Sequence, residues 1–244
     1  MIKRYWSILC IFVFCVGALP GCGVIDAVFL TPPQDTALEL LQAGNTAMEE
    51  KDYDQAITYY TKLKDRYPFS PYTSQAELRL ADAYFQDKRY AAAENAYKEF
   101  ESLHPGHDDI AYVLFRIGLS NFKHFKSIDQ PQDNVTEAMQ YFQRVAEAYP
   151  SAPIAEKARD YVRKCLRFQA EHEIFVADFY WRTKRYLSAW KRYEYVLEHF
   201  SMFEDIQEYA TTMNRLAYFM YQRQSAEKER VAQYGSWKQL FDWL

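Results

Sequence analysis

The chain has 244 residues, of which 49% are hydrophobic, so it is long enough to bury a sizeable core in one domain or one repeat array. Its 29 Lys and Arg residues are balanced by 33 Asp and Glu residues, which argues against a nucleic-acid-binding protein. Seven glycines are too few for an all-β fold rich in tight turns. The 21 tyrosines are typical of a repeat that needs an aromatic side chain at several fixed places.

The first residues have the pattern of an export signal. Lys3 and Arg4 precede a mostly apolar run over 5–19, which is too short for a comfortable membrane span. The run ends in Leu-Pro-Gly-Cys, which resembles a bacterial lipobox whose cysteine is Cys22. We therefore expect residues 1–21 to be a lipoprotein signal peptide. The alternative is a soluble secreted protein in which Cys22 has no such role.

If the lipobox is used, Cys22 becomes the lipid attachment site, and we expect no cofactor besides this covalent lipid. Acyl chains contribute about 0.8 kcal/mol per buried methylene, so two or three chains hold a protein on a bilayer permanently. Gly23 is not the aspartate that resembles an inner-membrane retention signal, so we expect an outer-membrane anchor with the body facing the periplasm. Residues 22–36 then form a tether, and Asp35 or Thr36 caps the first helix.

Residues 37–68 have the pattern of one tetratricopeptide repeat, a pair of antiparallel helices. Gly44 and Ala56 are the small residues that let the two helices approach, and Tyr60 is an aromatic that fills the space beside them. Asp52 and Tyr53 mark the turn, and Pro68 prevents the second helix from continuing.

The pattern recurs along the chain. The second repeat has Tyr84, Tyr90, Ala93, Tyr97, Phe100 and Pro105 at corresponding places. The third is looser and contains a polar loop over 124–134, the fourth follows a long helix that begins near Ile154, and the fifth, from about Glu204, is weak enough to be a capping repeat. We therefore predict an all-α fold, an α-solenoid of about five tetratricopeptide repeats with no strand.

One candidate peptide-binding feature is the joint between the first two repeats, where aromatic residues alternate with rigid prolines. Its residues are Tyr67, Phe69, Pro71 and Tyr72. These side chains either hold an extended peptide or only staple the two repeats together, and stapling fits Tyr67 and Phe69 better than Tyr72. A second feature is the concave groove expected along the first helices, which Asn45, Asp82 and Phe85 would line.

A candidate partner-docking feature is basic. Arg182, Arg185 and Arg192 belong to an electropositive stretch near the end of the long helix and in the helix that follows. Such arginines either dock an acidic partner surface or form a solvated face whose long stems cover apolar groups.

The sequence gives weaker support for an enzyme than for a binding protein. His104, His107, Asp108 and Asp109 crowd together, but Pro105 and Gly106 favour a turn in which Asp108 caps the next helix. The triplet Glu171, His172 and Glu173 lacks the second histidine that a zinc-protease helix needs. Cys165 lies in an apolar-periodic helix and fits a core thiol better than a nucleophile. We expect no catalytic residues and no metal site.

The run over 66–72, the segment from His104 to Gly118, the repeats and the lipobox together resemble the BamD family of outer-membrane assembly lipoproteins, also called ComL or YfiO. This resemblance implies a helical scaffold that binds the periplasmic domains of BamA, other lipoproteins of the assembly machinery, and unfolded β-barrel precursors. It implies that residues 37–150 receive precursors and that residues 151–244 bind BamA. Two rivals remain: a pilotin-type lipoprotein that delivers secretin subunits and, less attractive, a peptidoglycan-linked coordinator of envelope division.

Overall fold

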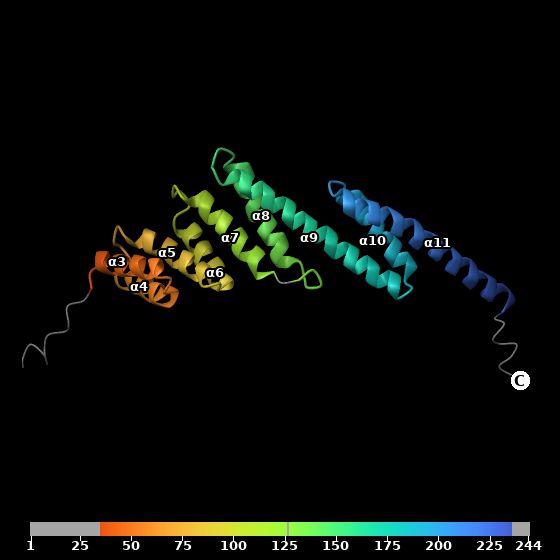
Figure 1. The fold of residues 1–244 in the computed structure, drawn as a ribbon, viewed down its shortest axis with the longest axis horizontal. Helices are drawn as coiled ribbons and strands as arrows, with labels where there is room; N and C mark the ends of the chain where they lie inside the picture. The colour runs from red at the N-terminus through yellow and green to blue at the C-terminus, as the bar shows by residue number, and fades with distance from the viewer. Residues whose placement is uncertain (1–34, 126, 236–244) are drawn as a thin grey trace, which may run out of the picture.

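The computed structural model describes residues 35–125 and 127–235, and α-helices are the only regular secondary structure in this part of the chain. Figure 1 shows the helices laid side by side in one elongated array, with the two described ends at its opposite extremes. The described helices are α3 (Ala37–Glu49), α4 (Tyr53–Arg66), α5 (Thr73–Gln86), α6 (Tyr90–Leu103), α7 (Ile110–His124), α8 (Asp133–Ala148), α9 (Ala155–Arg182), α10 (Tyr186–His199) and α11 (Glu204–Tyr234). The predicted all-α solenoid is confirmed.

Side-chain caps fix the N-termini of the first two described helices. Thr36 caps α3 through a reciprocal capping box, in which the Glu39 N–H donates to Thr36 Oγ1 at 3.2 Å and the Thr36 N–H donates to Glu39 Oε2 at 2.7 Å. Of the two predicted caps, Thr36 is therefore the one used. Asp52 caps α4 by accepting from the Gln55 N–H at 3.1 Å.

The joints between helix pairs follow the prolines. α4, α6 and α8 each end two residues before a proline, at Pro68, Pro105 and Pro150, because a proline disfavours a helical residue before it and cannot continue the helix itself. Within the pairs, the short turns place Lys51, Lys88 and Lys184 in the left-handed region, with φ near 60°. Three of the four helix pairs thus share one turn geometry.

Close packing inside each pair depends on a small residue opposite a ring. Gly44 on α3 faces Tyr60 on α4 so closely that a Cβ atom at Gly44 would lie 2.4 Å from Tyr60 Cε1. Gly118 on α7 faces Phe142 on α8 in the same way, with a Cβ contact of 2.9 Å. These contacts explain the small and aromatic places of the predicted repeat.

The residue after the small one is matched to the ring. Where the ring is a buried tyrosine, that residue accepts a hydrogen bond from the hydroxyl, in the pairs Tyr60–Asn45, Tyr97–Asp82 and Tyr193–Asp178. In the third helix pair the ring is Phe142 and the matched residue is Leu119. Each of these three buried hydroxyls therefore has a hydrogen-bond acceptor, and the third pair, which has no hydroxyl, has an apolar residue at the acceptor's place.

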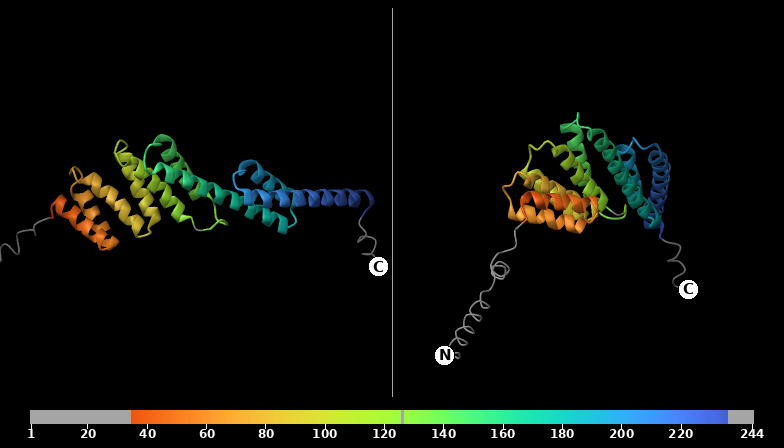
Figure 2. Two further views of the ribbon diagram at one scale, coloured as in Figure 1. Left: turned by 45° about the horizontal axis from the view of Figure 1, so that its top comes forward. Right: turned by 60° about the vertical axis from the view of Figure 1, so that its left-hand side comes forward.

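The long helix α9 joins the two halves of the array, and its N-cap at Ile154 agrees with the predicted start. Its first half packs with α7 and α8 in a core that includes Cys165, and its second half packs on α10 and α11. The fifth unit is a single helix in the described residues. As Figure 2 shows, α11 runs past the end of α10 without a break, so the described chain contains four helix pairs and one long terminal helix.

One predicted cap is wrong. α7 begins at Ile110 with no side-chain cap, and Asp108 takes no part, because the Asp109 N–H donates instead to His107 Nδ1 at 3.1 Å. Among the described helices, none combines the length and apolarity needed to cross a membrane.

Candidate protein-binding surfaces

At the joint between the first two helix pairs, two of the predicted aromatics hold the fold together. The Tyr67 hydroxyl donates to the Asp35 carbonyl at 2.7 Å, and the Tyr67 carbonyl accepts from Thr73 Oγ1 at 2.6 Å. Tyr67 and Tyr72 both pack against the core of the first helix pair. Tyr72 is thus as much a staple as Tyr67, although the sequence favoured that role less for Tyr72.

Phe69 at the tip of the same joint is different. It is 98% exposed, so the expectation that it staples the two repeats is wrong: the turn between the two prolines points its ring into solvent. Pro71 is exposed beside it. An exposed ring on a short loop anchored by Tyr67 and Tyr72 is an available contact for a partner.

The residues expected to line an open groove along the first helices contact other side chains of the protein. Asn45 Oδ1 accepts from the Tyr60 hydroxyl at 2.9 Å. Asp82 is only 8% exposed. The guanidinium carbon of Arg116 lies 3.6 Å from the centroid of the Phe85 ring, which covers that ring. These three places of the expected groove are therefore each engaged by another side chain of the protein.

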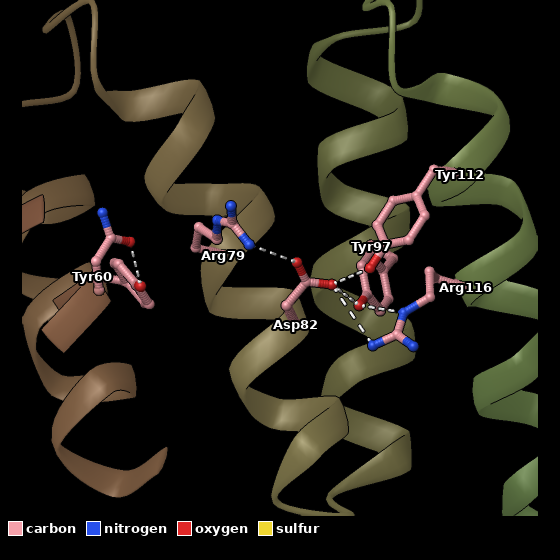
Figure 3. Close-up of polar contacts among 7 residues, drawn as sticks. Tyr60, Arg79, Asp82, Tyr97, Tyr112 and Arg116 are labelled. Atoms are coloured by element: carbon pink, nitrogen blue, oxygen red, sulfur yellow. Dashed lines mark hydrogen bonds and ion pairs between the residues drawn. The ribbon is translucent and has the colours of Figure 1, made fainter. Parts of the chain in front are cut away.

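The contacts around Asp82 form a polar network across three helices, drawn in Figure 3. Asp82 Oδ1 on α5 accepts from the Tyr97 hydroxyl on α6 at 2.5 Å and from the Tyr112 hydroxyl on α7 at 2.7 Å. Arg116 Nε donates to the Tyr97 oxygen at 2.8 Å, and its guanidinium lies 3.6 Å from the Asp82 carboxylate. Arg79 approaches the other carboxylate oxygen at 3.9 Å.

Burial and the Asp82 charge both raise the pKa of Tyr97 and of Tyr112 far above the ordinary tyrosine range. The network thus keeps both tyrosine hydroxyls protonated as donors to the Asp82 carboxylate, beside which Arg116 lies. Sequence reasoning missed it. The available signal was the spacing of fifteen residues from Asp82 to Tyr97 and again from Tyr97 to Tyr112.

The predicted basic residues do not form one equivalent set. Arg192 on α10 donates to Glu173 Oε2 on α9 at 2.6 Å and so ties two helices together. Arg182 and Arg185 are exposed around the α9–α10 turn, and neither makes an ion pair with any other described residue. Arg182 and Arg185 are therefore available to an acidic partner, whereas Arg192 is already engaged.

A second groove lies in the C-terminal half, where the sequence did not place one. It has a volume of about 450 Å³ and runs between α9 and α11 under the loop that connects α7 to α8. Its lining includes Ile128, Arg167, Phe175, Asp178, Asp205 and Tyr209. The loop is held there because the ring of His172 shares a hydrogen bond of 2.5 Å with the Ile128 carbonyl.

The residues considered for metal or nucleophile chemistry have structural partners. His104 Nε2 lies 2.6 Å from Glu77, while Glu171 and Glu173 pair with Arg167 and Arg192. Over 35–125 and 127–235, no group of three or more His, Cys, Asp or Glu side chains is placed to hold a metal ion. Burial raises the pKa of the Cys165 thiol to about 12, as is typical of an unreactive core cysteine. Cys22 lies outside the described residues.

Comparison with known proteins agrees with this architecture. The profile of the family described as YfiO, outer membrane lipoprotein, matches residues 33–233, which include α3 to α10 and all but the last residue of α11. The chain belongs to the YfiO family. The family resemblance predicted from the sequence motifs is thus confirmed.

Relatives within the YfiO family are named outer membrane protein assembly factor BamD. The Vibrio cholerae protein is 29% identical over 177 residues, covering 68% of this chain and 72% of its own length. The Pasteurella multocida protein is 26% identical over 193 residues, covering 75% and 73%. The Neisseria meningitidis serogroup A protein is 27% identical over 175 residues, covering 67% and 66%.

Proposed function

We propose that this chain is a non-enzymatic lipoprotein of the outer-membrane β-barrel assembly machinery, which binds BamA and unfolded outer-membrane protein precursors. The observation that supports this most directly is the family match over 33–233, together with relatives named as BamD assembly factors. A rigid helical array with separate exposed features at its two ends suits a scaffold that holds two different partners. Delivery of secretins in the manner of a pilotin is not favoured, because the relatives are assembly factors.

The proposal assigns lipid attachment to Cys22, which anchors the chain in the outer membrane with its helices in the periplasm. Residues 37–150 would meet precursors, and residues 151–244 would meet the periplasmic domains of BamA. The exposed Phe69 supports the first assignment, and the unpaired Arg182 and Arg185 support the second.

Affinity purification of the tagged chain from detergent-solubilised outer membranes tests the central claim. We expect mass spectrometry to find a protein with periplasmic domains joined to a membrane barrel, in stoichiometric amount. Recovery of a secretin without that protein would instead make the chain a pilotin. A Cys22→Ser variant should lose its lipid label and leave the membrane fraction.

Charge reversal tests the C-terminal surface. Arg182→Glu combined with Arg185→Glu should weaken BamA recovery several-fold at low salt, since both side chains are exposed and removal of either breaks no ion pair described above. The matched control is Arg66→Glu with Lys123→Glu, which changes the charge equally on exposed residues of the N-terminal half. Arg192 is left intact because reversing it would also break its contact with Glu173. Unchanged recovery would exclude this surface.

Truncation of Phe69 tests the N-terminal surface. Phe69→Ala should reduce photo-crosslinking to an unfolded β-barrel precursor without lowering the melting temperature, since the ring makes little contact with the fold. Leu103→Ala is the control, because Leu103 is another exposed apolar residue at the next inter-pair joint. Equal crosslinking for both variants and the native chain would remove Phe69 from the precursor site.

A further inference from the structure

The Asp82 network has a second copy in the C-terminal half. Asp178 on α9 accepts at Oδ1 from the Tyr193 hydroxyl on α10 at 2.5 Å and from the Tyr209 hydroxyl on α11 at 2.9 Å. As in the first copy, one tyrosine comes from the second helix of the same pair and the other from the next helix along the array. The two copies therefore have the same donors and acceptor in the same order.

The first copy is closed by an arginine of the protein itself. Arg116 stands one helical turn after Tyr112 and lies against the carboxylate (Figure 3). Its guanidinium also stacks on the Phe85 ring. A carboxylate this deeply buried needs such a partner, because an ionised group removed from water is costly unless it is paired.

The second copy has no such arginine. The residue one turn after Tyr209 is Met213, and Phe175 precedes Asp178 by the same three residues as Arg79 precedes Asp82. No Lys, Arg or His in the described ranges lies within ion-pair distance of Asp178. Burial and the bond to Asp178 raise the pKa of Tyr209, and the charge of Arg182, one turn further along α9, opposes this shift, but Arg182 makes no ion pair with Asp178.

Met213 itself packs on the last apolar core and does not line a groove, but open space lies beside Asp178 toward the start of α11. Asp178 and Tyr209 line the groove of about 450 Å³ between α9 and α11. The groove also contains Glu171 and Asp205, which share Arg167 at 2.9 and 2.6 Å, so three carboxylates face one cation. Phe175 is 38% exposed and Tyr209 is 43% exposed on its walls, which leaves aromatic surface beside the unneutralised carboxylate.

We propose that this groove binds an arginine side chain of a partner protein, presented on an extended segment next to an apolar residue. The incoming guanidinium does for Asp178 what Arg116 does for Asp82, from the groove side: it pairs with Asp178 and stacks on Phe175 or Tyr209. Arginine fits better than lysine, because its planar guanidinium stacks on rings and forms two parallel hydrogen bonds to a carboxylate. A metal ion fits poorly, since Glu171 and Asp205 are already held by Arg167 and no metal-binding group is present in the described chain.

Peptide titration of the full chain in detergent tests the proposal. The probe is the fluorescein-labelled peptide Gly-Leu-Arg-Phe-Gly, blocked at its C-terminus, and the comparison peptide has citrulline, a neutral isostere, in place of arginine. We expect saturable binding of the arginine peptide that weakens with salt, and binding at least about tenfold weaker for citrulline, as is expected for loss of one charge-assisted pair.

Two variants locate the site. Asp178→Asn keeps an acceptor for both tyrosine hydroxyls and removes only the charge, so it should weaken the arginine peptide about tenfold while the melting temperature stays near that of the native chain. Met213→Arg places an arginine where the first copy has Arg116, and should abolish binding by pairing with Asp178 from within the protein. Asp160→Asn is the matched control, because Asp160 is exposed on α9 outside the groove and should leave binding unchanged.

The proposal is overturned if the two peptides bind equally, if no saturable binding occurs, or if Asp178→Asn binds the arginine peptide as tightly as Asp160→Asn does. If Met213→Arg disrupts folding, the comparison of Asp178→Asn with Asp160→Asn decides alone. These outcomes are independent of whether BamA or a secretin is recovered from membranes.

Discussion

Single atoms decide how closely the first helix pair packs. At Gly44 the Tyr60 ring occupies the space that a side chain would need. Tyr60 is fully buried, and its hydroxyl donates a hydrogen bond to Asn45. Gly106, in contrast, has nothing within 4 Å of a Cβ position. The same residue type is therefore a packing requirement in one repeat and a tolerant turn residue in the next joint.

We predict that Gly44→Ala destabilises the protein by about 1–3 kcal/mol, because the added methyl overlaps a ring that has no room to move. Gly106→Ala should change stability by less than about 1 kcal/mol. Urea unfolding followed by circular dichroism compares the two. Equal stability of the two variants would contradict the packing assigned to Gly44.

Buried tyrosines make stability depend on alkaline pH. Burial raises the pKa of Tyr60 from the ordinary value of 10.0 to about 12, so the folded chain holds this proton after the unfolded chain has released it. The stabilisation is complete below the unfolded pKa and is lost as pH rises from about 10 to about 12. Tyr60→Phe, which has no hydroxyl to ionise, should lose less stability over this range than the native chain. Parallel slopes in a pH series of unfolding curves would refute the assignment.

At the scale of helix pairs, the ring on the second helix and the residue opposite it on the first helix are chemically matched. A buried tyrosine faces Asn45, Asp82 or Asp178, and the third pair has Phe142 and Leu119 at the corresponding places. Both members of the contact change together, because a buried carboxylate without a donor and a buried hydroxyl without an acceptor are each costly.

A double-mutant cycle tests this matching. Leu119→Asp should cost about 3 kcal/mol or more, since it buries an unpaired charge, and Phe142→Tyr should cost about 1–3 kcal/mol. The double variant should be more stable than the sum of the two losses predicts, by about 1 kcal/mol or more, because the new hydroxyl can donate to the new carboxylate. Simple additivity of the two losses would show that the third pair is not built like the others.

Over the whole molecule, stability is local. Separate apolar cores follow one another along the array, and each helix packs mainly on its neighbours in the chain. The N-terminal core lies on α3, α4 and α5, whereas the last two cores belong to α9, α10 and α11. Such an array behaves as a row of nearest-neighbour interfaces, so damage at one end need not loosen the other.

Leu63→Ala in the N-terminal core should therefore act locally. We expect hydrogen exchange to accelerate in α3, α4 and α5, where a buried leucine is lost at a cost of about 2–5 kcal/mol, and to remain unchanged in α9 and α10. Mass spectrometry of exchanged peptides measures both ends in one experiment. Faster exchange throughout the chain would show instead that the array unfolds as one unit.

Several features followed from the sequence alone because they depend on local chemistry. The prolines at 68, 105 and 150 end helices through the missing N–H, Thr36 caps the first helix, and Asp52 marks the turn after it. The spacing of Gly44 and Tyr60 encodes a helix pair. The family resemblance rested on such motifs and agrees with the profile match.

The binding surfaces depended on what the side chains meet in space. Phe69 and Tyr72 are three residues apart with similar patterns, yet one ring points into solvent and the other into a core. Phe85 and Phe175 both lie on first helices, but Arg116 covers the first and an open groove borders the second. Periodicity assigns a residue to a helix face, whereas its exposure and charge pairing depend on a helix much further along the chain. Arg116 follows Phe85 by 31 residues, and Tyr209 follows Phe175 by 34. For this reason, the sequence determined the solenoid, and only the tertiary structure decided which of its aromatic and charged residues remain available to a partner.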